Sequence, residues 1–200
     1  MLIRKIITLG LFCFASIVLA AQDSPVPMLE NSANSIINTL KQNQSSLKNH
    51  PQIVNKAIIT YLLPHMDVDG MSRSVLGRQV WNQISAQERK DFTAAFTKLV
   101  IRTYAVPIGE YSGETVKFMP IRGYNDARFV QVKSIIFRPN GQKIPLTYSL
   151  VSKNANWMIY DLSVDGVSLL QSYKTQVSSS LQKSNIRALI QQMNANKKAT

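Results

Sequence analysis

The segment from Trp157 to Val177 constrains the fold more than any other part of this chain, because its apolar spacing changes from strand-like to helical within a few residues. Aromatic and β-branched residues up to Val164 are those that a half-buried strand favours. Asp165-Gly166 is typical of a turn, and the apolar residues that follow recur at helical spacing. The sequence therefore predicts a strand that passes through a tight turn into a helix.

Helices are predicted on both sides of a block of strands. Apolar stripes and helix-ending prolines predict four helices in the first half, at about 29–47, 52–63, 70–76 and 86–106. The fourth begins at a capping box formed by Ser85 and Glu88, and Pro107 is expected to end it. Two further helices are predicted after the strands, at about 168–182 and 185–194.

Four strands are predicted between these helices, at about 114–119, 128–138, 143–152 and 157–164. Asn140-Gly141 predicts a tight hairpin between the second and third strands. In the second strand the apolar phase shifts between Val132 and Ile135, which predicts a bulge or a bend there.

Helices, then strands joined by short turns, then helices indicate an α+β fold. We expect a four-stranded, mostly antiparallel, curved sheet that N-terminal and C-terminal helices cover, with room for an apolar pocket. The expected single domain spans residues 21–200, with a helical part at about 28–105, the sheet at 106–165, closing helices at 166–196 and a basic tail at 197–200.

The first twenty residues have the features of an export signal. Arg4 and Lys5 precede an apolar stretch, and Val18-Leu19-Ala20 supplies the small residue of a cleavage site. The stretch is short for a transmembrane helix, although an uncleaved N-terminal anchor is the alternative. Cys13, the one cysteine of the chain, lies within this stretch, so the exported protein would contain no disulfide, thiolate nucleophile or sulfur-ligated metal.

The chain is strongly basic, with a formal net charge of +12. Most of this charge is expected to serve solubility, but cations outnumber carboxylates across the second half, which favours encounter with an anionic surface. In an exported protein that surface would be lipid headgroups or an acidic protein partner. Nucleic acid is not expected, because the chain carries an export signal and no zinc, RNP or helix-turn-helix pattern.

Metal-binding patterns are weak. His50 and His65 each lie beside a proline and have no metal-ligand spacing, so we expect surface histidines and no metal site. Asp67 and Asp69 lack the remaining ligands of a calcium loop, and one of them is expected to begin a helix.

Enzyme patterns are also weak. The chain has no nucleophile-elbow motif and no Gly-rich phosphate loop. Tyr160-Asp161 is the one pair that could imitate the Asp and Tyr of an isomerase, but neighbours on a strand point to opposite faces. We therefore expect Asp161 to bond to a backbone amide or an arginine at the sheet rim.

A resemblance to a known family is carried by the segment that switches from strand to helix. Its sequence, WMIYDLSVDGVSL followed by Tyr173-Lys174, resembles the signature of the periplasmic phospholipid-binding proteins of the Mla pathway, also called the toluene-tolerance family. The resemblance extends over about residues 30–196. Matches upstream, in type and order, are Leu62-Leu63-Pro64, Ser74-Val75-Leu76-Gly77 before Trp81, Ala86-Gln87-Glu88-Arg89 before Phe92, and the stretch from Phe96 to Tyr104.

The resemblance implies an NTF2-like sheet wrapped by helices around a deep apolar cavity that takes up acyl chains. It implies a periplasmic, non-enzymatic carrier that maintains outer-membrane lipid asymmetry. Its partners would be an outer-membrane lipoprotein–porin complex and an inner-membrane ABC transporter with a lipid-binding ring. The carrier would be a monomer without a cofactor, and phospholipid would be its cargo.

A lipid cavity would have to enclose the acyl chains. Burying a methylene is worth ~0.8 kcal/mol, so leaving about thirty methylenes in water would cost over ~20 kcal/mol of free energy.

The candidate lining residues, each of which could equally belong to solid core, are Phe92, Phe96, Leu99, Val100, Tyr104, Val130, Val132, Ile144, Leu146, Tyr148, Leu150, Val167, Leu170 and Tyr173. The candidates for headgroup binding or partner docking are Arg122, Arg128, Lys133, Lys143 and Lys174.

Two alternatives stay open at this point. The first is an exported NTF2-like enzyme that acts on a small apolar substrate, which would need a convergent Asp/Tyr or Asp/His pair inside the cavity. The second is a basic module that binds a cell-envelope polymer and needs no cavity.

Overall fold

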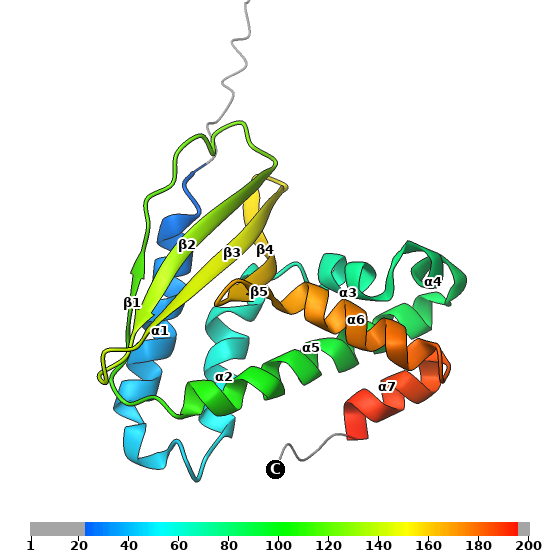
Figure 1. Cartoon of the computed structure of the whole chain (residues 1–200), viewed down its shortest axis with the longest axis horizontal. Helices are drawn as coiled ribbons and strands as arrows, with labels where there is room; N and C mark the ends of the chain where they lie inside the picture. The colour runs from blue at the N-terminus through cyan, green and yellow to red at the C-terminus, as the bar shows by residue number, and fades with distance from the viewer. Residues whose placement is uncertain (1–22, 196–200) are drawn as a thin grey trace, which may run out of the picture.

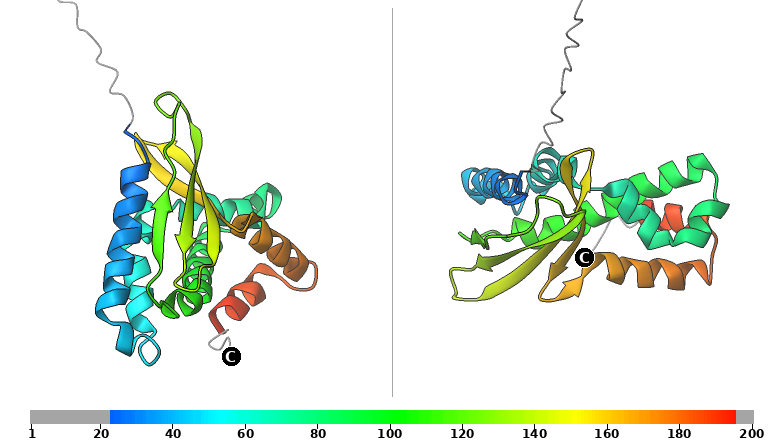
Figure 2. Two further views of the ribbon diagram at one scale, coloured as in Figure 1. Left: turned by 60° about the vertical axis from the view of Figure 1, so that its left-hand side comes forward. Right: turned by 90° about the horizontal axis from the view of Figure 1, so that it is seen from above.

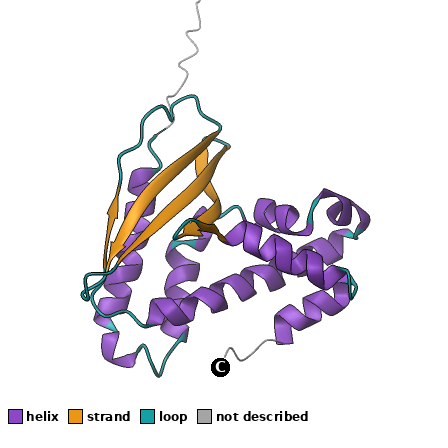
Figure 3. Ribbon diagram, in the orientation of Figure 1, coloured by secondary structure: helices purple, strands orange, loops and turns teal. Residues whose placement is uncertain are grey.

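The computed structural model describes residues 23–195, and they form seven α-helices and one five-stranded sheet (Figures 1 and 3). The helices are α1 (Val26–Gln42), α2 (Gln52–Tyr61), α3 (Val68–Leu76), α4 (Arg78–Gln83), α5 (Ala86–Gly109), α6 (Leu169–Leu181) and α7 (Ile186–Ala195). The strands are β1 (Thr115–Phe118), β2 (Phe129–Phe137), β3 (Lys143–Lys153), β4 (Asn156–Val164) and β5 (Val167–Ser168). The predicted signal peptide and basic tail lie outside the described residues.

The strands follow chain order across the sheet, and each neighbouring pair is antiparallel. Asn154 and Ala155, at φ 50° and 61°, form the two-residue turn between β3 and β4. Between β2 and β3, Gly141 at φ 86° donates its backbone N–H to the carbonyl oxygen of Arg138, at 3.0 Å. The hairpin predicted at Asn140-Gly141 is therefore confirmed.

The irregularity in the sheet involves β4, not β2 as predicted. β2 pairs with β1 and β3 without a register shift, whereas the β3–β4 register shifts between Ser149 and Leu150. In β2, Val132 packs in the apolar cluster under the sheet, while Ile135 alternates to the opposite face. Apolar residues therefore occupy both faces of β2. In the sequence this looks like a shift in the apolar alternation, although the strand itself is regular.

Helix α1 covers one face of the sheet (Figure 2). Its Leu29 packs into a buried cluster with Val132 on β2, Leu150 on β3 and Ile159 on β4. We call α1 and the five strands the sheet lobe. The alternation of apolar residues along β2 and β3 supplies the inner face of this lobe.

A helical lobe, made of α3, α4, α6, α7 and α5 as far as Tyr104, lies beside the sheet (Figures 1 and 2). Phe92 and Phe96, one helical turn apart on α5, are buried there with Tyr173 of α6. The 24 residues of α5 extend about 36 Å. Its C-terminal end reaches α2, where Ala105 is buried in the same cluster as Ile58.

The α+β class is confirmed, with five strands instead of four. The capping box of Ser85 and Glu88 is present at the start of α5, and Asp67 begins α3 by accepting a hydrogen bond from the backbone N–H of Gly70. The prediction that Pro107 ends the fourth helix is wrong, because Pro107 lies in the last turn and removes only one hydrogen bond near the helix end.

Other boundaries also differ from prediction. The first helix begins at Val26 and ends at Gln42, and a short 3₁₀ turn (Gln44–Ser46) follows it. Helix α4 and strand β5 were not predicted, because six and two residues are too few to reveal a period. Within residues 23–195, no helix combines the length and apolar character needed to cross a bilayer.

Candidate functional site

The junction between sheet and helices is organised by the carboxylate of Asp161. It accepts hydrogen bonds from the Ser168 hydroxyl at 2.6 Å and from the backbone N–H groups of Leu162 and Leu170 at 2.8 and 3.0 Å. Ser168 also caps α6 by accepting from the Gln171 N–H at 3.0 Å. These contacts fix how the chain passes from β4 through β5 into α6.

Two more contacts tie distant segments to β4. The indole nitrogen of Trp157 donates to the carbonyl oxygen of Asp23 at 2.8 Å, which holds the start of the described chain against the sheet. The backbone N–H of Asp67 donates to the carbonyl oxygen of Ile159 at 2.8 Å, so the start of α3 is bonded directly to the sheet. The signature segment therefore connects the two lobes.

Six of the predicted lining residues lie on the inner face of the sheet. They alternate along two paired strands, so that Val132 lies opposite Tyr148 and Val130 lies opposite Leu150. The side chain of Leu146 is only 8% exposed. The six residues, all packed in the sheet-lobe cluster, are Val130, Val132, Ile144, Leu146, Tyr148 and Leu150.

Seven more predicted lining residues lie in the helical lobe. Phe92 is fully buried, and its ring stacks on Phe96 with centroids 5.9 Å apart. The rings of Tyr173 and Phe96 form a T-shaped pair with centroids 5.3 Å apart. The seven residues are Phe92, Phe96, Leu99, Val100, Tyr104, Leu170 and Tyr173. The fourteenth, Val167, is 60% exposed at the β5 turn and packs in neither cluster.

The two sets of residues meet at Met66, which packs against both the sheet-lobe cluster and the helical-lobe cluster. Burial raises the pKa of Tyr148 to about 12, and burial together with the nearby Tyr173 raises that of Tyr104 to about 12. Both hydroxyls are therefore neutral at physiological pH. The clusters on both sides of Met66 consist of apolar and aromatic side chains, and lipid contact by the predicted residues stays a prediction.

The five predicted basic residues are exposed, but they are not grouped together. Arg128 lies over the Phe129 ring at 5.4 Å and Lys143 over the Phe137 ring at 5.8 Å, both at the sheet. Lys133 is on β2, and Arg122 is in the loop before it. Lys174 is on α6, in a hollow of about 600 Å³ that also contains Arg73 and Arg78.

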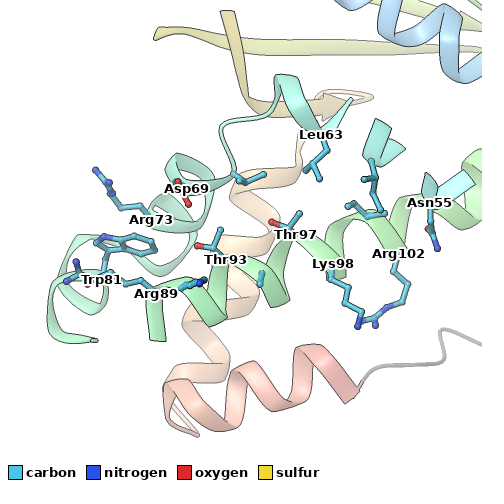
Figure 4. Close-up of a pocket in the computed structure, with 15 residues that line it drawn as sticks. Asn55, Leu63, Asp69, Arg73, Trp81, Arg89, Thr93, Thr97, Lys98 and Arg102 are labelled. Atoms are coloured by element: carbon cyan, nitrogen blue, oxygen red, sulfur yellow. Dashed lines mark hydrogen bonds between the residues drawn. The ribbon is translucent and has the colours of Figure 1, made fainter. Parts of the chain in front are cut away.

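A groove that the sequence did not predict runs along α5 (Figure 4). Its volume is about 890 Å³, and none of the predicted lining or basic residues lines it. At one end, the guanidinium groups of Arg73 and Arg89 both lie over the ring of Trp81, 5.5 and 5.6 Å from its centroid. The lining residues are Asn55, Ile59, Leu63, Val68, Asp69, Arg73, Trp81, Arg89, Lys90, Thr93, Ala94, Thr97, Lys98, Ile101 and Arg102.

The pair expected of an isomerase-like enzyme does not converge. Tyr160 and Asp161 were expected to point to opposite faces of a regular strand, and the register shift in β4 interrupts that alternation. The two side chains nevertheless have different surroundings. Tyr160 forms a T-shaped pair with Phe129, with ring centroids 5.8 Å apart, whereas Asp161 is occupied by its three hydrogen bonds. The structural role expected for Asp161, bonding to a backbone amide, is confirmed. Within residues 23–195, no three His, Cys, Asp or Glu side chains are grouped to hold a metal ion.

Comparison with known proteins assigns this architecture to a family. The family described as MlaC protein matches residues 30–195, which include both lobes and the junction at Asp161. The chain belongs to the MlaC family. A relative in Haemophilus influenzae, the intermembrane phospholipid transport system binding protein MlaC, is 26% identical over 176 residues, covering 86% of this chain and 82% of the relative.

Two further similarities agree with this family. The toluene tolerance protein ttg2D of Pseudomonas putida is 21% identical over 182 residues, covering 91% of this chain and 84% of that protein. A solved structure of a phospholipid-binding protein from Ralstonia solanacearum, in complex with a phospholipid, superimposes with a TM-score of 0.78 at 23% identity. The superposition covers 86% of this chain and 96% of the other, so the two chains share their fold over most of their length.

Proposed function

We propose that this protein is a periplasmic phospholipid carrier of the Mla type. It would receive lipid from one membrane complex and deliver it to another, between an outer-membrane lipoprotein–porin complex and an inner-membrane ABC transporter. The single observation that carries the proposal is the family match over residues 30–195, because it spans both lobes and the connection between them. The H. influenzae relative is named as a phospholipid transport binding protein.

The acyl chains are placed between the two lobes in this proposal. At ~0.8 kcal/mol for each methylene, the tails need a site that excludes water on all sides. The groove along α5 is open to solvent and lined by several charges, so it would leave one side of each tail wet. The apolar interior where both clusters meet Met66 is enclosed, and bound tails would separate the two clusters there.

The test is to purify the full chain from the periplasm and identify the lipids extracted from it by mass spectrometry. We expect phospholipid at a defined ratio to protein, and transfer of that lipid to acceptor vesicles by the purified carrier. The intact mass of the same sample reports whether residues 1–20 have been removed. Protein that emerges lipid-free and cannot be loaded from phospholipid vesicles would contradict the proposal.

A further inference from the structure

The groove along α5 combines an apolar floor with a cationic rim (Figure 4). It follows the helix face that carries Lys90, Ala94 and Lys98, opposite to the face that buries Phe92 and Phe96. Apolar side chains from three helices and one turn form its floor: Ile59 on α2, Leu63 in the turn after it, Val68 on α3, and Ala94 and Ile101 on α5. Five cations and one carboxylate, Asp69, stand among its lining residues.

Several groups in the groove have unused binding capacity. Ile59 is 49% exposed, although it is a large aliphatic side chain on a helix. The side-chain oxygen of Asn55 is buried without a hydrogen-bond partner among the described residues. Lys90 and Lys98 form no ion pair with any residue in 23–195. An apolar strip flanked by unpaired cations and an unfilled acceptor indicates a surface prepared for a partner.

We propose that this groove receives an amphipathic helix with acidic flanks from a partner protein. The inference goes beyond lipid carriage and does not depend on it, because the groove lies outside the lobe interior where the acyl chains are placed.

The shape of the groove favours a helix over other occupants. Its walls are helices, whose backbone groups are already bonded, so an extended peptide would gain no backbone hydrogen bonds from the groove. A helix brings its backbone hydrogen bonds with it and presents an apolar stripe to the floor. A flat bilayer surface cannot fill a concave groove. The stretch from Arg89 to Arg102 is about 20 Å long, which matches three to four turns of helix.

The charge of the rim favours an acidic partner and disfavours a second copy of this chain. Arg73 and Arg89 are held in place by Trp81, and Lys90 and Lys98 project beside the apolar floor. Helix flanks rich in Glu or Asp would pair with them and speed the encounter. This chain carries 23 Lys and Arg against 11 Asp and Glu, and its helices α2, α6 and α7 contain no carboxylate. A second copy therefore cannot supply such a helix from these elements.

The test uses a synthetic probe and the full mature protein. The probe is a fluorescent peptide of about 18 residues, with Leu at i, i+3, i+4 and i+7 spacing, Glu on the flanks and Ala elsewhere. We expect saturable binding that weakens about tenfold in a Lys90→Glu/Lys98→Glu protein and several-fold in an Ile59→Gln protein. A Lys48→Glu/Lys183→Glu protein has the same change of net charge at exposed sites away from the groove, and it should bind within about twofold of the wild type.

Two controls make the result decisive. A peptide of the same composition with its leucines dispersed should not bind, and circular dichroism should show that every variant keeps the wild-type fold. Equal binding of both peptides, or equal binding by the Lys90→Glu/Lys98→Glu protein, would overturn the proposal. So would failure of the peptide to bind while anionic vesicles bind in a Lys90- and Lys98-dependent manner, because the surface would then recognise membrane. Lipid content of each variant, measured in parallel, separates loss of docking from loss of cargo.

Discussion

The carboxylate of Asp161 on β4 accepts a 2.6 Å hydrogen bond from the hydroxyl of Ser168, the residue that caps α6. Asp161 belongs to a strand of the sheet lobe, and Ser168 caps a helix of the helical lobe. This one hydrogen bond therefore links the two lobes. The two positions, seven residues apart, enclose the Asp165-Gly166 turn, whose residues have φ of 48° and 80°. This contact gives a structural reason for the pattern of polar residues in the signature segment.

Removing either partner should weaken the junction unequally. Ser168→Ala removes the helix cap and should lower the free energy of unfolding by about 1 kcal/mol. Asp161→Ala also leaves the backbone N–H groups of Leu162 and Leu170 unpaired, and should cost about 2–4 kcal/mol. Urea titration of both variants and of the double variant measures the coupling. Ser179→Ala, at an exposed position of α6, is the control, and a Ser168→Ala effect no larger than that of the control would refute a stabilising role.

The junction and the sheet could be predicted because their signals are local. The turn at Asp165-Gly166 and the hairpin at Asn140-Gly141 each depend on a few adjacent residues. The alternation along β3 marks Leu146, Tyr148 and Leu150 as buried, and they are. Alternation reports burial and not the identity of the neighbour, so it cannot separate a lipid contact from solid core.

The groove could not be predicted because it is assembled from segments far apart in sequence. Asn55, Trp81 and Arg102 come from α2, α4 and α5, and no spacing relates them. The apolar stripe of α5 predicts the burial of Phe92 and Phe96, which the structure confirms, but the opposite face, with Lys90 and Lys98, has the pattern of an ordinary solvated helix surface. That face becomes the floor of a groove only because residues of α2, α3 and α4 line the groove with it.

A charge on the inner face of the sheet should remove lipid. Leu146→Asp places a carboxylate in the sheet-lobe cluster, where it would be desolvated beside the proposed acyl chains. Thr147→Asp puts the same group on the opposite face of the same strand and is the matched control. We expect Leu146→Asp to lose most copurified phospholipid while remaining folded, and the control to keep it. If Leu146→Asp fails to fold even with lipid present during refolding, Leu146 is solid core and its assignment to the cavity is wrong.

Stability should decline in acid partly through Glu114, which pairs with Arg138 at 3.3 Å. Burial acts to raise the pKa of Glu114, but hydrogen bonds from Ser112 and the charge of Arg138 outweigh it and leave this pKa below its ordinary value of 4.5. A lowered folded-state pKa gives stability that is present above the unfolded pKa and lost as pH falls through the folded value.

The pH dependence of Glu114→Gln tests this assignment. Denaturation at a series of pH values from about 6 to about 2.5 should show a smaller loss of unfolding free energy in the variant than in the wild type. Glu110→Gln changes a nearby exposed carboxyl that forms no ion pair within residues 23–195, and its profile should follow the wild type. Identical profiles for all three proteins would show that the Glu114 pair does not contribute.

The basic residues around the sheet should affect the rate of lipid transfer and not the stability of the fold. Lys133 on β2 and Arg122 in the preceding loop are exposed, and neither forms an ion pair among the described residues. Reversing both to Glu should leave the melting temperature nearly unchanged, because exposed charges contribute little to stability. Transfer to anionic vesicles should slow at low salt and recover toward the wild-type rate as the Debye length falls from ~10 Å at 0.1 M to ~3 Å at 1 M. The Lys48→Glu/Lys183→Glu protein has the same net charge, so it shows whether transfer depends on these two positions or on total charge. Equal slowing of transfer in both proteins would mean that only total charge matters, and no slowing in either would show that Arg122 and Lys133 serve solubility alone.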